Sequence, residues 1–570
     1  MFLFDFFRSL LPLHNPIGFG ASDFVSVTFA LVLAAAAIAW PRVALWTERF
    51  AARTGWCMLA LAILPIILRL ALLPNHPVPT ADIYDEFGHL LEADTLRHFR
   101  LANPPHALPQ FFETQFVLEQ PTYSSIYPLG QALALAAGWS LTGHPWAGVL
   151  LAVGAFCGLC YWMLRAWTTP GWALAGGLLA VAEFGPLNYW MNSYWGGGLA
   201  AAAGCLVFGA LPRLARTAPA GAPGWGRSWK YAAALGTGLG LHLLIRPFES
   251  IFLLLSVLLF FAPNVRRPKW FRAYWRLLPA AALPVAAALA LMLLQNRAVT
   301  GNWTTLPYQL SRYQYGVPAA LVYQTNPFPH RQLNREQALN YQMQKGFHGN
   351  SPETWRSFGE RLEYRVRFYR FFFLAPLYLV LPLFLWRART YWWVLLSLAS
   401  FGLGANLYPN FETHYIAAAT CLFVLAAVIG LEQLARISPE ASRILGFLCL
   451  AQFLFWYTMH LFDNQPFSMA ARQFETWDGL NHRNPAARIE VNRRLAMLPG
   501  QLLVFVRYYP QHPFQQEWVY NAADIDGSRI VWARDLGPEE DAQLRAYYPN
   551  RSVWLLEPDY RPPRLTHLAP

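Results

Sequence analysis

Apolar runs of about twenty residues follow one another through most of this chain, and they constrain its fold more than any other feature. The 570 residues are 55% hydrophobic and only 13% charged. Soluble domains are about 25% charged, so the composition indicates that a lipid bilayer is the main solvent. The net charge of +12 lies mostly in short connections between apolar runs, which does not indicate a nucleic-acid partner. We therefore predict an α-helical polytopic membrane protein with about 11–13 transmembrane helices.

Thirteen apolar runs are candidate spans, and several of them are short. Trp and Tyr residues lie near many of their ends, as in the aromatic belts at the two membrane surfaces. The runs cover residues 22–40, 55–74, 126–142, 146–165, 171–190, 197–213, 231–246, 249–262, 277–294, 369–386, 391–408, 414–431 and 444–462.

Lysine and arginine in the connections set the predicted orientation, because cytoplasmic loops of membrane proteins are enriched in these residues. The stretches 213–230 and 263–276 carry four and five basic residues, respectively, and no acid. We expect both stretches in the cytoplasm. The turn at 246–249 between them then faces outward, and counting onward places the loop 295–368 and the tail from residue 463 outside as well.

The loop 75–125 is also expected outside, since it holds seven acids against two arginines. Four candidate spans separate this loop from the cytoplasmic stretch 213–230, and an even number of crossings cannot join opposite sides. One of the four is therefore expected not to cross. The run 126–142, which contains Pro, Gly and Ser, is the expected exception.

The tail differs from the rest of the chain in composition, and three regions are predicted. Residues 1–54 form an N-terminal helix and a cytoplasmic loop, 55–462 form the transmembrane domain with its outer loops 75–125 and 295–368, and 463–570 form a small extracytoplasmic α/β domain. In the tail, short alternating runs predict strands and one capped run predicts a helix. The predicted strands cover 500–510, 517–524, 528–536 and 551–559, and the predicted helix covers 537–549.

The acidic side chains of the first outer loop are the first candidates for chemistry. Asp82, Asp85, Glu86, His89 and Glu92 lie within eleven residues, directly after a predicted span. Their spacing places several of them on one face of a helix that lies along the membrane. A carboxylate beside a low-dielectric surface binds a proton more tightly, which suits a general base. Acids that merely solvate an outer loop have the same composition, so the residues alone leave both interpretations open.

The arrangement resembles the GT-C superfamily of membrane glycosyltransferases, which includes the protein O-mannosyltransferases and the aminoarabinose transferases of lipid A. The resemblance covers roughly 55–462. Its motifs are the acidic pair Asp85-Glu86 after a spanning helix, and Tyr127-Pro128-Leu129-Gly130, where the family has a second proline in place of Leu129. It implies that an acid of the first outer loop deprotonates an acceptor, which attacks the anomeric carbon of a sugar on a polyprenyl phosphate. Asp85 is then the base and Glu86 its partner or substitute.

A phosphate leaving group needs a cation nearby. Arg246 interrupts an apolar stretch, and ionisable residues at membrane depth are costly and tend to be functional. The alternative for Arg246 is a position at the membrane surface or a pair with Glu249. His89, one turn after Asp85, is assigned to the same substrate site.

Two further outer segments are expected to converge on this face. Asn192, Tyr194 and Trp195 precede a glycine run and suit a sugar ring, although an ordinary interfacial aromatic belt has the same composition. Glu412 and His414 stand at the start of an apolar run, where His414 suits either a phosphate contact or a helix cap. The family resemblance further implies that a loop such as 295–368 covers the lipid-linked sugar.

The sequence lacks the motifs that are typical of several other enzyme classes. The sequence has no GxxxxGK[ST] loop, no HExxH and no GxSxG. The first loop has no Asp-x-Asp pair, and Asp524-Ile525-Asp526 in the tail is interpreted as a turn. No metal site and no cofactor are predicted.

We therefore predict an inverting glycosyltransferase of the plasma (inner) membrane, with its active face and C-terminal domain extracytoplasmic. Its expected partners are a polyprenyl-phosphate-linked sugar, an acceptor that is a protein, a lipid or a glycan, and the lipid bilayer. The alternative from another class is a transporter or flippase of lipid-linked intermediates, which internal inverted symmetry would favour. No such symmetry is evident in the sequence.

Overall fold

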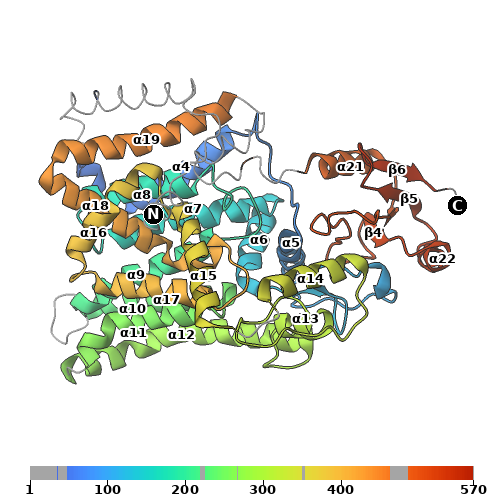
Figure 1. Cartoon of the computed structure of the whole chain (residues 1–570), viewed down its shortest axis with the longest axis horizontal. Coiled ribbons are helices and arrows are strands. Elements are labelled where there is room, and N and C mark those ends of the chain that lie inside the picture. Colours follow the sequence, from blue (N-terminus) through green and yellow to red (C-terminus); the bar gives the residue numbers. More distant parts are fainter. Residues whose placement is uncertain are drawn as a thin grey trace.

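The computed structural model describes residues 48–217, 225–265, 268–349, 353–462 and 485–568, together with residues 35 and 480. Long helices run side by side in one body, and a small sheet domain lies at one end of it (Figure 1). The predicted α-helical membrane fold with a C-terminal α/β domain is thus confirmed. The predicted span 22–40 lies outside the described residues, apart from Ala35.

The long helices reproduce most of the predicted spans. Six segments in the described part of the chain are long and apolar enough to cross a membrane, namely 54–71, 146–164, 198–216, 274–300, 413–437 and 439–461. The helices of this body are α4 (Thr54–Ala71), α6 (Leu129–Thr142), α7 (Trp146–Leu164), α8 (Pro170–Phe184), α9 (Gly198–Thr217), α10 (Trp225–Ile245), α11 (Ser250–Val265), α12 (Pro268–Thr300), α17 (Trp392–Ala405), α18 (Thr420–Ile437) and α19 (Pro439–Phe462).

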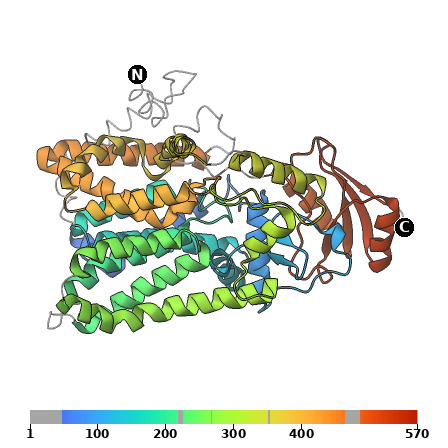
Figure 2. The same ribbon diagram turned by 60° about the horizontal axis from the view of Figure 1, so that its bottom comes forward.

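The core of this body lies where α7, α9 and α18 meet, and α10 packs between α9 and α12. Figure 2 shows α10, α11 and α12 as a layer along one side of the body. Large apolar side chains remain exposed on the outer helices, among them Ile67 on α4, Leu258 on α11 and Leu283 on α12. Such a surface is stable only when it faces lipid.

Helix α6 has 14 residues and extends about 21 Å, whereas the hydrocarbon core is about 30 Å thick. Helix α17, at the predicted span 391–408, has the same length. The expectation that the run 126–142 does not cross the membrane therefore stays a prediction.

The predicted span 369–386 is wrong as a continuous helix. The chain there forms short pieces, η2 (Arg367–Phe372), η3 (Ala375–Leu379), α16 (Leu381–Phe384) and η4 (Leu385–Arg387). Pro376 and Pro382, which have no backbone N–H to donate, each lie in the first turn of a separate piece, η3 and α16, where a helix start tolerates the missing donor.

The outer segments are largely helical. The first outer loop holds α5 (Tyr84–Arg97), the short helix η1 (Pro109–Phe111) and a small hairpin of β1 (Val117–Leu118) and β2 (Ser124–Ser125). Helix α12 continues through residues that were predicted to be loop. The rest of the predicted loop 295–368 contains α13 (Pro307–Tyr315), α14 (Arg335–His348) and α15 (Trp355–Val366), and η5 (Thr413–Ala419) precedes α18.

The C-terminal domain is a four-stranded sheet in the order β4-β3-β5-β6. The first three strands are parallel and β6 is antiparallel to β5. The predicted strand 517–524 is wrong, because the segment is not part of the four-stranded sheet, and the adjacent side chains of Trp518 and Val519 enter the same core, whereas neighbours in a strand point to opposite faces. The elements are α21 (Ala486–Met497), β3 (Leu502–Val506), β4 (Ile530–Arg534), α22 (Pro538–Tyr547), β5 (Ser552–Glu557) and β6 (Arg564–His567).

One face of this sheet packs against the first outer loop. Leu91 of α5 and Phe111 of η1 lie in the same buried cluster as Phe505 of β3 and Leu555 of β5. The first outer loop and the C-terminal domain therefore share a hydrophobic core, although nearly 400 residues separate them in sequence.

Candidate active site

Helix α5 presents Asp85, Gly88, His89 and Glu92 on one face, as the sequence spacing predicts. The hydroxyl of Tyr127 donates a hydrogen bond to Asp85 Oδ1. The His89 ring lies 4.3 Å from the Tyr127 ring, measured between centroids. Burial raises the pKa of Tyr127, and Asp85 raises it further, so the phenol keeps the proton that it donates. Asp85 is thus held by a neutral donor.

Two glycines permit this contact. A Cβ atom on Gly88 would lie 2.7 Å from Tyr127 Cε2, and one on Gly130 would lie 2.4 Å from Ile245 Cγ1 and 2.9 Å from the backbone nitrogen of Ile245. Gly88 therefore lets the Tyr127 ring lie flat against α5. Gly130 lets the start of α6 touch the end of α10, which brings Tyr127 close to Arg246.

Arg246 follows the last residue of α10, at the break that the sequence predicts. Arg246 is half-buried as a residue, and its guanidinium lies 4.5 Å from the centre of the Tyr415 ring. It makes no side-chain hydrogen bond to any residue in the described ranges. Its charge acts on Tyr127, Tyr308 and Glu249, and the last of these faces it from the start of α11. The alternative of a direct pair with Glu249 is therefore not the arrangement seen.

Asp85 and Arg246 act on the same aromatic side chains. Tyr308 on α13 interacts electrostatically with both residues, and so does Tyr415 on η5. The Tyr308 ring lies 5.7 Å from that of Tyr127. A carboxylate and a cation therefore share one group of tyrosines, Tyr127, Tyr308 and Tyr415, that comes from three separate segments.

His414 lies beside this group, and Trp195 lies beside His414. The two rings are 4.8 Å apart between centroids. Nδ1 of His414 is 3.2 Å from the hydroxyl of Tyr189, which is also 2.9 Å from Thr413 Oγ1. Burial raises the pKa of Tyr189, and Glu412 raises it further, while Arg246 acts in the opposite direction. The structure thus brings Trp195, Glu412 and His414 into the neighbourhood of Arg246.

Glu86, Tyr194 and Asn192 lie in a supporting network instead. Glu86 accepts backbone N–H groups of Asp82 at 3.0 Å and of Tyr194 at 2.9 Å, so it ties the loop after α8 to the start of α5. The Tyr194 hydroxyl donates to the carbonyl of Pro79 at 2.8 Å. Asn192 Oδ1 accepts a hydrogen bond of 2.6 Å from Arg69 in α4.

His89 and Glu92 are buried behind Tyr127. Burial lowers the pKa of His89 to about 3, and the charge of Arg246 contributes to the lowering. Burial raises the pKa of Glu92 to about 8, against a 3.2 Å hydrogen bond from Gln295 that acts in the opposite direction. Gln295 also donates to the Tyr127 carbonyl at 2.9 Å. Both titratable groups are therefore neutral near pH 7, and Glu92 supports the backbone of Tyr127 through Gln295.

Three arginines of the segment 295–368 are committed to acceptors within the protein. Arg365 donates to the carbonyls of Ala405, Tyr408 and Pro409 at 2.6 to 2.8 Å and so closes the end of α17. Arg312 donates to the carbonyls of residues 318 and 319 at 3.1 and 3.0 Å. Arg331 pairs with the carboxylate of Glu113 at 2.8 Å. These arginines thus fix the segment 295–368 and its contacts with α17 and the loop 75–125.

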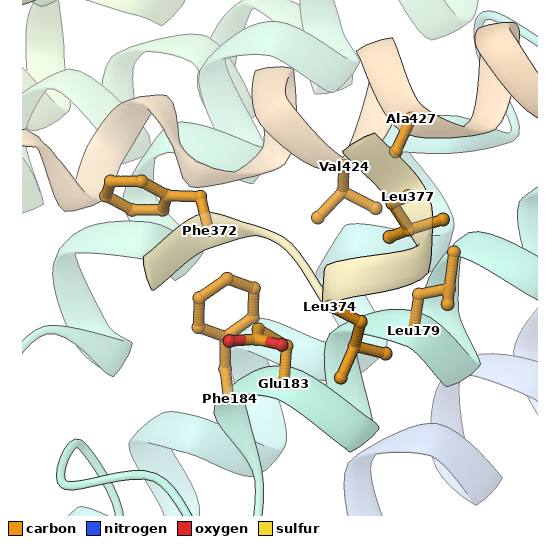
Figure 3. A pocket seen from close by; sticks show the side chains of 8 residues that line it. All are labelled: Leu179, Glu183, Phe184, Phe372, Leu374, Leu377, Val424 and Ala427. Carbon is orange, nitrogen blue, oxygen red and sulfur yellow. The ribbon is translucent and has the colours of Figure 1, made fainter. Parts of the chain in front are cut away.

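A small cavity of about 10 Å³, about the room of one water molecule, lies between α8, the irregular segment after α15 and α18, and no predicted site residue lines it. Figure 3 shows the carboxylate of Glu183 among Phe184, Phe372 and Leu374. Glu183 Oε2 makes no hydrogen bond within the described part of the chain. Sequence reasoning did not select Glu183, although a single acid in the apolar helix α8 is a signal that would have found it.

Several other residues of the aromatic group were also missed. Tyr308 lies in the long outer loop without a distinctive motif, so sequence carries no signal for it. Tyr127, Tyr415 and Glu249 lie in or beside segments that the sequence indicated, but they were not themselves predicted as site residues. In the described ranges, no group of three or more His, Cys, Asp or Glu side chains is placed to hold a metal ion. Asp526 lies in a turn, as predicted.

No protein family and no curated protein matches this chain. Among solved structures it is similar to ArnT from Cupriavidus metallidurans in the apo state, with 11% identity and a TM-score of 0.49 over 89% of this chain and 93% of that one. The same protein bound to undecaprenyl phosphate gives 12% identity and a TM-score of 0.49, over 88% and 93%. The oligosaccharyltransferase AglB from Archaeoglobus fulgidus, in complex with an inhibitory peptide and a dolichol-phosphate, gives 9% and 0.39, over 88% and 69%.

The fit of Tyr127 against α5 can be tested by Gly88→Ala. The added Cβ meets the Tyr127 ring, so the ring must move and its hydrogen bond to Asp85 must break. We expect a loss of about 1–3 kcal/mol in unfolding free energy, measured by denaturation in detergent. Gly346→Ala is the matched control, because a Cβ there meets nothing within 4 Å. Equal stability of the two variants would show that Tyr127 does not lie against α5.

The buried carboxyl of Glu92 should make stability depend on pH. The native state keeps a proton up to about pH 8, which the unfolded chain releases near pH 4.5. The free energy of unfolding should therefore fall as pH rises between these values, by at most about 1.4 kcal/mol per pH unit. Glu92→Gln should flatten this decline in melting temperatures between pH 5 and 8, whereas the exposed Glu363→Gln should leave it unchanged. An unaltered decline in Glu92→Gln would contradict the assignment.

Proposed function

We propose that this protein transfers a sugar from a polyprenyl-phosphate donor to an acceptor at the outer face of the membrane, with inversion at the anomeric carbon. The observation that supports the proposal best is the pairing of Asp85 with Arg246 around one group of tyrosines. A general base and a cation for an anionic leaving group are the two requirements of such a transfer.

The proposed reaction is a single displacement. Asp85 accepts the proton of the acceptor hydroxyl as the acceptor oxygen forms a bond to the anomeric carbon. The bond between that carbon and the phosphate oxygen breaks, and the electron pair leaves with the phosphate. Arg246 stabilises the charge that develops there, because its donors are not used by neighbouring side chains. Attack from the side opposite the leaving group inverts the configuration.

The surrounding aromatic side chains suit a sugar ring. Tyr308 and Tyr415 flank Arg246, and Trp195 lies against His414. Binding sites for small molecules are mostly lined by apolar and aromatic groups, with a few polar groups that set orientation. We propose that these three aromatic residues hold the sugar and that His414 and Glu412 contact its polar groups.

Glu86, Tyr194 and Asn192 are proposed to act as positioning residues. Their hydrogen bonds join α4, α5 and the loop after α8, which carries Trp195 at its end. This assignment differs from the direct substrate contacts expected of them from sequence. In this proposal Glu86 fixes the start of α5 next to the base and does not act as a second base.

The base is tested by Asp85→Asn, which keeps the shape of the side chain but removes its ability to accept a proton. We expect kcat for sugar transfer from polyprenyl-phosphate donors to fall by about 10²- to 10⁴-fold in membranes with normal expression. The isosteric Glu360→Gln on the exposed surface of α15 is the control and should leave kcat unchanged. Full activity of Asp85→Asn would show that another residue is the base. A flippase of lipid-linked sugars would need no base and would tolerate the change.

The phosphate contact is tested by Arg246→Gln with undecaprenyl phosphate as the probe. Loss of a charge-assisted contact should weaken binding to the purified protein by about 10- to 100-fold. Asp85→Asn should bind the probe normally, because the base contacts the acceptor rather than the phosphate. The control is Arg356→Gln, whose side chain is 88% exposed. Binding that is equal in Arg246→Gln and the control would remove Arg246 from the site.

A further inference from the structure

The C-terminal domain contacts α5 directly beside the proposed base. The ring of Phe87, two residues after Asp85, stacks on the ring of Tyr520 with centroids 4.3 Å apart and planes 6° from parallel. The guanidinium of Arg488 lies 4.6 Å from the centre of the Phe87 ring and 4.6 Å from that of Trp518. Two side chains of the C-terminal domain, Tyr520 and Arg488, thus contact one aromatic ring of α5, and Trp518 lies against Arg488.

The contact continues along the helix. Leu91 lies in the core that the first outer loop shares with the sheet. Asp94 Oδ2 accepts the backbone N–H of Ala523 at 2.9 Å. Residues 87, 91 and 94 follow helical spacing, so they form one continuous face of α5.

This face is opposite the one that carries the candidate chemistry. At about 100° per residue, Phe87, Leu91 and Asp94 lie about 160°, about 120° and about 180° around the helix from Asp85. The chemical face meets Tyr127 and Gln295 of the transmembrane body. Helix α5 therefore lies between the two parts of the protein, and each part supports one of its faces.

The segment after α5 is held by the same part of the C-terminal domain. The Tyr520 hydroxyl donates to the carbonyl of Gln115 at 3.3 Å, and Gln115 Nε2 donates to the carbonyl of Phe514 at 2.8 Å. The Tyr123 hydroxyl donates to the carbonyl of Asn521 at 3.1 Å. The link therefore includes the hairpin that leads to Tyr127, the residue that holds Asp85.

Tyr520 is also within electrostatic reach of the base. Burial raises the pKa of the Tyr520 hydroxyl, and Glu517 and Asp85 raise it further. Phe87 is the residue through which this part of the C-terminal domain contacts the first turn of α5.

We infer that the C-terminal domain is a positioning element of the active site, and that Tyr520 positions Asp85 through the Phe87 stack. The inference rests on the proposed role of Asp85 as the base. It gives the domain a task in turnover that differs from docking the acceptor. Tyr520 itself is a positioning residue, because it contacts the base only through α5.

The test compares Tyr520→Ala, Tyr520→Leu and Tyr520→Phe in the full-length protein. The first two remove the aromatic stack, and Leu keeps an apolar side chain in case Ala destabilises the domain. A small misplacement of a catalytic group costs rate, so we expect kcat to fall by about 10- to 100-fold in both. Tyr520→Phe keeps the stack and should restore kcat to near the wild-type value. Tyr560→Ala, a change at an exposed tyrosine of the same domain, is the control.

Two further readouts separate positioning from general damage. A base that is released from its hydrogen-bonding donor is harder to ionise, so the acid limb of the kcat profile should move to higher pH in Tyr520→Ala and Tyr520→Leu. Binding of undecaprenyl phosphate should stay within twofold of wild type. These shifts are not expected when a variant merely lowers the amount of folded protein.

Three outcomes would overturn the inference, and they differ in what else they affect. Wild-type kcat and pH profile in Tyr520→Ala and Tyr520→Leu, with Asp85→Asn inactive, would refute it and leave the proposed function standing. Loss of activity together with loss of lipid binding and an unchanged pH profile would reduce Tyr520 to a general structural role and would also refute it. Full activity of Asp85→Asn would instead refute the proposed function on which the inference rests.

Discussion

The candidate site depends above all on the support of helix α5 from two sides. An isolated helix of 14 residues is marginally stable in water, so packing must fix it. The transmembrane body holds one face through Tyr127, and the C-terminal domain holds the opposite face through Tyr520. The two contacts together determine the position of Asp85. This explains how an acid in an outer segment can have a defined position without lying in a regular membrane helix.

The second constraint comes from the bilayer, which leaves no backbone polar group without a partner at membrane depth. The backbone polar groups at helix ends have no partner within the helix, so side chains or segments outside the membrane must supply their hydrogen bonds. Tyr127 precedes α6, Arg246 follows α10 and His414 lies in η5 before α18. Arg365 closes the end of α17 by donating to three carbonyls. The polar chemistry of the protein thus lies where its helices begin and end.

How much could be predicted from sequence depended on whether the information was local. The acid face of α5 and the break at 246–249 could be predicted, because spacing and composition within a few residues determine them. Asn192 could not be placed, because its partner Arg69 lies 123 positions away. The segment 517–524 has apolar and aromatic residues typical of a strand, yet the neighbours Trp518 and Val519 enter the same core, which only the tertiary structure reveals. For the same reason, the link between α5 and the C-terminal domain had no sequence signal.

The distribution of arginine contacts indicates which cation is available to a substrate. Arg69 and Arg365 donate to acceptors inside the protein, and burial without such acceptors would be costly for a guanidinium. Arg246 is partly exposed, stacks on Tyr415 and donates to no side chain in the described ranges. Its neighbour His89 is held neutral by burial and therefore does not compete for an anion. A phosphate beside Arg246 would supply hydrogen-bond acceptors for its guanidinium. For this reason we propose that Arg246, rather than an arginine of the long loop 295–368, contacts the phosphate.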